Sequence, residues 1–235
     1  MHPEPPPPRD FDNPFCTRRV QPGALPYRFV ASDTLDDVLA RLRAQAWRGA
    51  IVGPHGSGKS TLLAALLLRL EAEPPTPARR VYRVNLHDGQ RSIPKGTFPA
   101  ERLDRQALVV IDGYEQLSGW ARLRLGWRVR RADCGLLVTA HRPVRLAEVF
   151  RTATTAALAQ TLVESLLRDE PSGFCPSPEQ IASLLRSEHG DLRETLFALY
   201  DLYEAHKQAL RGEAAAVLGA DGSGPPSDRT PVRRE

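Results

Sequence analysis

Few of the features that build membrane spans, disulfide frameworks or zinc sites are present in this sequence. The longest apolar run, Leu62 to Leu68, is too short to cross a bilayer, and the first residues show neither the basic nor the apolar segment of a secretory signal. The cysteines Cys16, Cys134 and Cys175 stand far apart without a Cys-x-x-Cys pair. Neither a disulfide framework nor a zinc site is therefore expected. These absences predict a cytoplasmic protein with free thiols and no membrane contact.

Lysine is also scarce, because only Lys59, Lys95 and Lys207 interrupt a basic set of 32 residues that is otherwise arginine. The two cations are not interchangeable where a compact charge must fit between phosphates, and Lys59 stands inside a glycine-rich segment. The net charge of +4 is compatible with nucleic-acid binding and equally with an arginine-rich composition. Overall charge therefore leaves the partner open.

The chain of 235 residues has room for one α/β core and a small appendage. Residues 1–25 and 212–235 are rich in proline, glycine or charge and are predicted to be disordered tails. Strand and helix periods alternate over 26–155, which predicts a parallel α/β core, and helical periods alone fill 156–211. The expected strands are 49–53, 81–86, 107–111, 136–140 and, more weakly, 149–155, and the expected helices are 33–46, 60–70, 120–131, 156–168, 177–188 and 191–210.

A phosphate-binding motif, G-x-x-x-x-G-K-[ST], lies between the first of these strands and the next helix. Its glycines let backbone N–H groups surround a β-phosphate, and the helix that follows offers its N-terminal dipole. Lys59 is expected to reach the β and γ oxygens, and the hydroxyl of Ser60 to coordinate Mg²⁺. The motif predicts that ATP and Mg²⁺ are bound by Gly53, Pro54, His55, Gly56, Ser57, Gly58, Lys59, Ser60 and Thr61.

A carboxylate follows the apolar strand Leu108–Ile111 directly, at Asp112. A residue at this place can hold Mg²⁺ beside a phosphate cradle, through water or together with Ser60. An aspartate at the end of a strand can also be a plain turn residue. Together with the motif, the spacing predicts that Ser60 and Asp112 are the metal ligands.

With these two segments in order, the sequence resembles AAA+ P-loop ATPases over most of residues 30–210. Leu136 to Pro143, Leu-Leu-Val-Thr-Ala-His-Arg-Pro, looks like the fourth strand of that superfamily, whose tip carries a polar sensor residue near the γ-phosphate. The resemblance assigns this role to Thr139, with His141 in reserve. It implies a three-layer P-loop NTPase fold with a parallel sheet, followed by a small helical lid.

A second resemblance lies in the lid. Gly190 to Leu196, Gly-Asp-Leu-Arg-Glu-Thr-Leu, is similar to the sensor-2 helix, in which an arginine points back at the γ-phosphate, and this assigns Arg193. Ile111 to Leu117 and Val138 to Pro143 are similar to segments of DnaA-like proteins. Within the superfamily, the initiator and helicase-loader branch therefore fits best.

The sequence departs from the family at Gly113, where such ATPases carry an acid after the strand. Glu115 is the nearest carboxylate, and a turn at Gly113, which glycine permits, would fold it toward the nucleotide. Otherwise Glu115 begins the following helix and interacts with its dipole. Helical content between Leu86 and Ala107 is also reduced relative to the family. Glu115 is the predicted base, with slow intrinsic turnover.

The predicted helix 120–131 carries an apolar and a basic stripe. Trp120, Leu123 and Trp127 recur at i, i+3 and i+7, so this face is expected to pack on the sheet. The neighbouring face holds three arginines that either contact a polynucleotide or stay solvated: Arg124, Arg128 and Arg131.

The motifs together favour an ATP-driven switch or motor subunit, with Mg-ATP between core and lid and the lid angle reporting to a partner protein or nucleic acid. A homo-oligomer is compatible with this, since Arg142, Arg145 and Arg151 are candidates for reaching a neighbouring subunit. A P-loop small-molecule kinase and a non-hydrolysing ATP-dependent binding module remain as alternatives. The segments that mark ABC transporters and GTPases are missing or misplaced.

Overall fold

The computed structural model describes residues 13–72, 79–94, 96–98, 102–168 and 170–220. Five strands form one parallel sheet in the order β2-β3-β4-β1-β5. The predicted α/β class is confirmed, and each expected strand is present within a few residues. The strands are β1 Arg48–Val52, β2 Arg80–Asn85, β3 Ala107–Asp112, β4 Gly135–Ala140 and β5 Ala147–Arg151.

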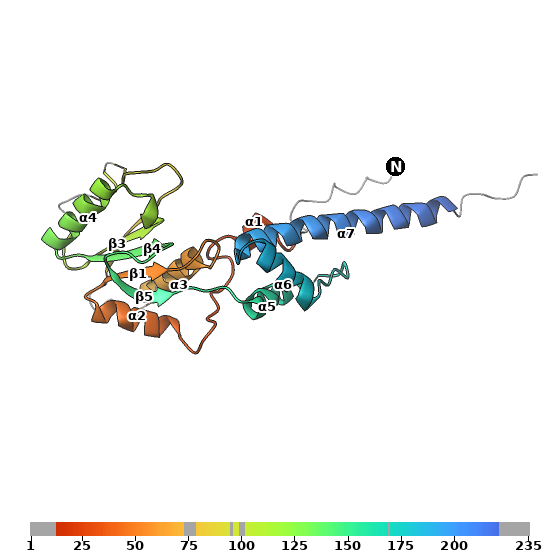
Figure 1. The fold of residues 1–235 in the computed structure, drawn as a ribbon, viewed down its shortest axis with the longest axis horizontal. Helices are drawn as coiled ribbons and strands as arrows, with labels where there is room; N and C mark the ends of the chain where they lie inside the picture. The colour runs from red at the N-terminus through yellow and green to blue at the C-terminus, as the bar shows by residue number, and fades with distance from the viewer. Residues whose placement is uncertain (1–12, 73–78, 95, 99–101, 169, 221–235) are drawn as a thin grey trace, which may run out of the picture.

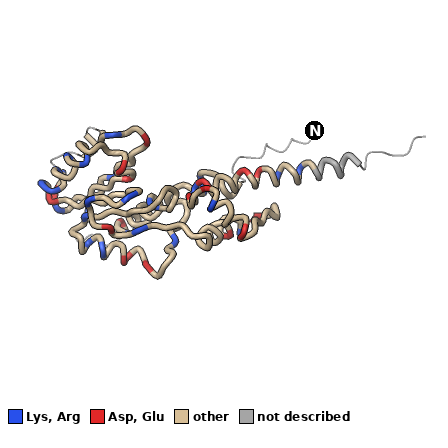
Figure 2. The backbone as a smooth tube through the Cα atoms, in the orientation of Figure 1, with Lys and Arg blue, Asp and Glu red and all other residues tan. Residues whose placement is uncertain are grey.

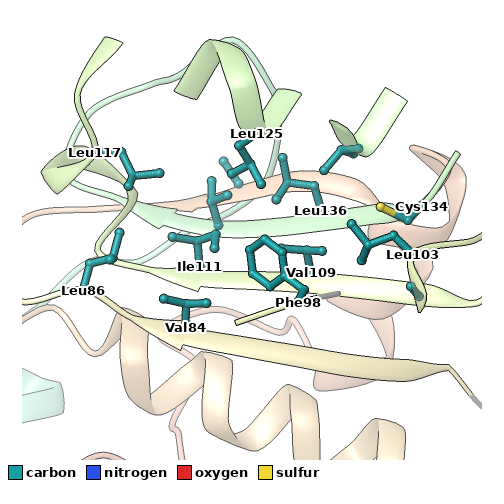
Figure 3. Packing of buried hydrophobic residues seen from close by; sticks show 14 of the residues in the cluster. Val84, Leu86, Phe98, Leu103, Val109, Ile111, Leu117, Leu125, Cys134 and Leu136 are labelled. Atoms are coloured by element: carbon teal, nitrogen blue, oxygen red, sulfur yellow. The ribbon is translucent and has the colours of Figure 1, made fainter. Parts of the chain in front are cut away.

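Helices cover both faces of the sheet (Figure 1). Helices α2 (Leu35–Ala44) and α3 (Lys59–Glu71) lie on one face, and α4 (Gly119–Arg131) lies on the other. Side chains alternate between the faces along each strand: Val110 packs with α2 and α3, whereas Val109 and Ile111 pack with α4. Figure 3 shows this second cluster, with Val109 and Ile111 beside α4. The result is the predicted three-layer arrangement.

The face of α4 that meets the sheet is not the predicted one. Leu125 and Val129 are buried against the strands, while the side chains of Trp120, Leu123 and Trp127 are 81%, 64% and 60% exposed. The helix has two apolar stripes, and the one that contains Leu125 and Val129 packs on the sheet. The expectation that the tryptophans pack inward was wrong.

A separate helical bundle follows the sheet and forms its own apolar cluster. It consists of α5 (Ala156–Leu167), α6 (Pro178–Ser187) and α7 (Leu192–Ala220). Ser177 caps α6, and proline occupies the first helical position. Helix α7 continues to Ala220, past the predicted end at 210, because the alanine-rich residues 213–220 favour helix. The rest of the predicted C-terminal tail lies outside the described residues.

Residues 13–25 have defined structure, although the sequence predicts a tail up to 25. Phe15 is completely buried in the bundle, edge-on to Phe174 and Tyr203. Asn13 donates to the carbonyl of Tyr200 at 3.2 Å. The short helix α1 (Thr17–Val20) follows and lies beside α7 in Figure 1. A single aromatic residue such as Phe15 creates no periodic pattern in a proline-rich stretch, so the sequence did not indicate that it is buried. Residues 1–12 lie outside the described part.

None of the helices in the described part of the chain is long and apolar enough to cross a membrane.

Candidate nucleotide-binding site

The predicted site residues meet at the carboxyl edge of the sheet. Strand β4 lies between β1 and β3, so the loop after β1, the end of β3 and the tip of β4 open on one edge. These places hold the P-loop (residues 53–61), Asp112 and Thr139, respectively. Ser60 and Thr61 belong to the first turn of α3, whose N-terminal amides face the loop.

The shape of the P-loop requires its glycines. Gly56 and Gly58 have φ angles of 61° and 84°, a left-handed conformation that other residues rarely adopt. A Cβ atom on Gly53 would lie 2.1 Å from Oγ1 of Thr152. The hydroxyls of Ser57 and Thr152 share a buried hydrogen bond of 2.6 Å. Thr152, the residue directly after β5, therefore anchors the P-loop.

Lys59 is folded back onto the P-loop. Its ammonium donates to the carbonyls of Gly53 at 2.9 Å and Pro54 at 2.5 Å and contacts Nδ1 of His141 at 3.1 Å. The residue is 8% exposed, and this burial lowers the pKa of Lys59, while the nearby carboxylates of Glu115 and Asp112 act in the opposite sense. A buried ammonium whose hydrogen-bond partners are all neutral is suited to pair with an anion such as phosphate.

The two predicted metal ligands are in contact. Ser60 Oγ donates to Oδ1 of Asp112 at 3.1 Å. Thr139 Oγ1 donates to the same oxygen at 2.6 Å and accepts from the backbone N–H of Gly113 at 2.9 Å. The Thr139 hydroxyl is thus occupied in orienting Asp112, and its predicted sensor role remains a prediction. Arg83 of β2 approaches Oδ2 of Asp112 at 3.8 Å.

A turn at Gly113 places Glu115 beside His141, and Glu115 also lies in the helix that follows, so both alternatives drawn from the sequence are met and its role as base stays a prediction. Gly113 has a φ of 83°, and Glu115 lies on the following 3-10 helix η3 (Tyr114–Gln116). Its Oε1 is 2.6 Å from Nε2 of His141, whereas Oε2 is buried without a hydrogen-bond partner among the described residues. Glu115 therefore connects to Lys59 through a single imidazole.

The two neighbours of His141 determine its tautomer. An ammonium can only donate, so Nδ1 must accept from Lys59 and Nε2–H must donate to Glu115. Burial, and then the charge of Lys59, lower the pKa of His141, which favours this neutral form. The ring of His55 stacks on His141 with centroids 3.5 Å apart. From the sequence, His141 was only the second candidate for the sensor residue, and the stacking of the two histidines was not predicted. The only signal for the stack was the presence of one histidine in the P-loop and another just after the tip of β4.

The lid touches the P-loop through Asp191, not through Arg193. Asp191 caps α7 by accepting from the backbone N–H groups of Arg193 and Glu194. A Cβ atom on Gly56 would lie 1.7 Å from its Oδ1, so the carboxylate sits directly on the loop. The guanidinium of Arg193 lies over the ring of Phe197, 5.6 Å from its centroid, and is exposed. Its predicted contact with a γ-phosphate stays a prediction.

An aromatic cluster that the sequence analysis did not identify borders the other side of the P-loop. Tyr27 packs edge-on against Phe29 and Phe150. Its ring lies 3.3 Å from where a Cβ atom on Gly58 would stand. Burial, assisted by the charge of Asp33, raises the pKa of Tyr27 to about 12. The N-terminal segment thus runs from the bundle to the loop and presents a neutral aromatic ring there.

Comparison with known proteins shows the fold. No family model matches the sequence, and no curated protein does either. A chain in a structure of Drosophila ORC bound to DNA superposes with a TM-score of 0.56 and 14% identity, over 89% of this chain and 65% of that one. The Aeropyrum pernix ORC1 protein in complex with DNA matches with a TM-score of 0.54 and 20% identity, over 81% and 62%.

The chain thus shares its fold with these two proteins, a parallel α/β fold consistent with a P-loop NTPase, and it spans somewhat less than two thirds of the length of each. The narrower resemblance to DnaA-like proteins stays a prediction.

Proposed function

We propose that this protein is an ATP-dependent switch that binds Mg-ATP between its α/β core (26–155) and its helical lid (156–211). The observation that carries the proposal is the convergence of Lys59, Ser60 and Asp112 at one edge of the sheet. These groups supply a cation for the β and γ oxygens and two oxygen ligands for a metal. The loop conformation that a phosphate needs is built into the chain.

The residues present fit Mg²⁺ bound together with a nucleotide. Among the described residues, no group of three or more His, Cys, Asp or Glu side chains could hold a metal ion. Mg²⁺ keeps several waters and binds through one or two protein ligands plus phosphate oxygens. Ser60 and Asp112 are such a pair, and the metal would neutralise charge on the phosphates.

The lid would report the state of the nucleotide. Asp191 places a negative charge on the P-loop at Gly56, where it would repel an incoming phosphate. Nucleotide binding would therefore displace the start of α7 and bring Arg193 within reach of the γ-phosphate. The partner that senses this motion is a protein or a nucleic acid; both matched solved structures contain DNA, and a homo-oligomer is a further outcome to test.

Replacing Asp112 with asparagine should weaken the dependence on Mg²⁺ more than the binding of ATP. The amide can still accept from Thr139, but it lacks the anionic charge that attracts the metal. Loss of a residue that only hydrogen-bonds a metal ligand costs about 10–100-fold in metal affinity. Loss of a charged ligand should cost no less, so the Mg²⁺ concentration for half-maximal effect should rise at least about tenfold. Titration of Mg²⁺ at fixed ATP measures this; Asp201→Asn, on the exposed side of α7, is the control. An unchanged titration curve would remove Asp112 from the site.

Replacing Arg193 with alanine should weaken ATP binding and spare ADP. A charge-assisted hydrogen bond is worth about 1.5–3 kcal/mol, so the affinity for ATP should fall roughly 10–100-fold, while ADP lacks the group that Arg193 would hold. Calorimetric titration of both nucleotides gives the two constants. Arg186→Ala, an exposed lid arginine, should change neither. Equal losses for ATP and ADP would show that Arg193 serves only the structure of the lid and would argue against the switch.

A further inference from the structure

The outward side of α4 combines exposed aromatic and basic side chains. Trp120, Leu123 and Trp127 are more than half exposed, an unusual state for large apolar groups on one helix. Three exposed arginines lie among them on the same side. We call this surface the α4 outer face; it comprises Trp120, Leu123, Arg124, Trp127, Arg130 and Arg131.

No acidic residue balances these charges within α4, and Figure 2 shows Lys and Arg recurring along this helix. Arg131 places its guanidinium over the ring of Trp127, 5.6 Å from the centroid. Arg122 and Arg128 point elsewhere, because they donate to the carbonyls of Glu115 and Phe98. The basic stripe expected from the sequence therefore differs in one residue: Arg130, not Arg128, lies beside Arg124 and Arg131 on the outer side of α4.

We propose that the α4 outer face binds single-stranded nucleic acid. Unpaired bases have flat apolar faces that stack on indole rings, and the phosphates between them attract guanidinium groups. Trp120 and Trp127 stand two helical turns apart, about 10.5 Å along the axis, so two bases of one strand can each use a ring. Single-stranded nucleic acid would therefore cover the exposed indole rings with its bases and neutralise the positive charge with its phosphates.

The same features disfavour other occupants. The outside of a duplex offers phosphates for the arginines, but its bases are stacked inside and leave nothing for Trp120 to cover. A second copy of this face would bring a matching set of arginines against Arg124, Arg130 and Arg131, and like charges at close range repel. An apolar protein partner would leave the arginines without counter-charges.

The α4 outer face is connected to the nucleotide site through Arg122. This residue donates to the carbonyl of Glu115 at 2.7 Å, and its guanidinium lies over the ring of Tyr114. Ser118, which caps α4, follows η3 after one residue. A strand on α4 would therefore act on the element that carries Glu115, and this coupling step, unlike the binding itself, rests on the proposed function.

The binding test uses the full chain without nucleotide. Anisotropy of a labelled 20-nucleotide single strand is compared with that of the corresponding duplex. Trp120→Ala with Trp127→Ala keeps every charge and should weaken single-strand binding at least about tenfold, from stacking worth about 1–3 kcal/mol per base. Changing Arg124, Arg130 and Arg131 to Gln should flatten the slope of log affinity against log salt by about 2, at roughly 0.7 per phosphate.

Two control variants make matched changes on the lid. Leu202→Ala removes another exposed apolar side chain, and a triple change to Gln removes three exposed arginines, at Arg168, Arg186 and Arg211. Both should keep the affinity within about threefold and the slope unchanged, because stacking and phosphate contacts are assigned to α4.

Three results would overturn the inference: no single-strand binding at low salt, duplex binding as tight as single-strand binding with the tryptophan variant unaffected, or a dimer that the tryptophan variant dissociates in sedimentation. Lys59→Ala separates the two proposals, since it should abolish ATP binding and leave strand binding intact. A wild-type protein that binds the strand but not ATP would overturn the proposed function alone.

Discussion

Replacing Lys59 with alanine should abolish the stabilisation of this protein by ATP. Wild-type protein at an ATP concentration a hundred times its dissociation constant gains about 2.7 kcal/mol, or roughly 5–10 °C in melting temperature for a chain of this size. The ammonium of Lys59 is the one cation that contacts the P-loop carbonyls of Gly53 and Pro54 among the described residues. Without it, the β- and γ-phosphates would lose the cation that stands within the P-loop itself.

The fold itself should survive this change. The Lys59 ammonium bonds to the carbonyls of Gly53 and Pro54, and its burial lowers its pKa. Removing the side chain therefore removes a desolvation cost together with these hydrogen bonds. The melting temperature without nucleotide should stay within a few degrees of wild type. Differential scanning fluorimetry with and without Mg-ATP measures both quantities, and Lys207→Ala, at a lid lysine over Tyr203, is the control. A Lys59→Ala protein that ATP stabilises as strongly as wild type would refute the assignment of the P-loop.

Replacing Glu115 with glutamine should stop ATP cleavage while ATP stays bound. General bases contribute about 10²–10⁴-fold to rates, and the single-turnover rate should fall by this factor. The substitution is conservative here, because Nε2–H of His141 can donate to an amide oxygen as it does to Oε1. What is lost is the basicity of Oε2, a buried oxygen without a hydrogen-bond partner among the described residues, which as the proposed base would take the proton of the attacking water.

Two companion variants separate a base from a structural acid. His141→Asn should slow cleavage by a smaller factor, because Glu115 keeps its carboxylate but loses the imidazole that orients it. Glu179→Gln, in the first turn of α6, should have no effect. If Glu115→Gln cleaves ATP as fast as wild type, with and without single-stranded nucleic acid, Glu115 is not the base. If wild type does not cleave ATP at all, the protein is a non-hydrolysing ATP-dependent module.

The parts of the site that could be predicted depend on short-range rules. The P-loop needs positive φ at Gly56 and Gly58, and a turn at Gly113 has the same requirement, so the residue type itself indicates the conformation. Asp112 ends a strand whose five preceding residues are all buried, and burial on both faces of a central strand is visible as an unbroken apolar run. These elements are where the sequence predicts them.

The parts that could not be predicted depend on contacts between distant segments. Asp191 and Gly56 meet across the boundary of core and lid, and Phe15 is buried by Phe174; neither pairing has a periodic signal. Thr139 was assigned from a resemblance, yet a hydrogen bond to the neighbouring strand occupies its hydroxyl. The direction of a side chain at a strand tip depends on which partner is nearest, and a sequence does not show that distance.

The sequence by itself determined the class of the fold, the order of its elements and the P-loop, because backbone conformation and apolar periodicity are properties of neighbouring residues. Only the tertiary structure decided which stripe of α4 faces the sheet, that His141 joins Glu115 to Lys59, and that Asp191 covers the loop. Each of these results from competition for space or for a hydrogen-bond partner between segments far apart in the chain. The outcome of this competition depends on how the segments pack against one another in three dimensions.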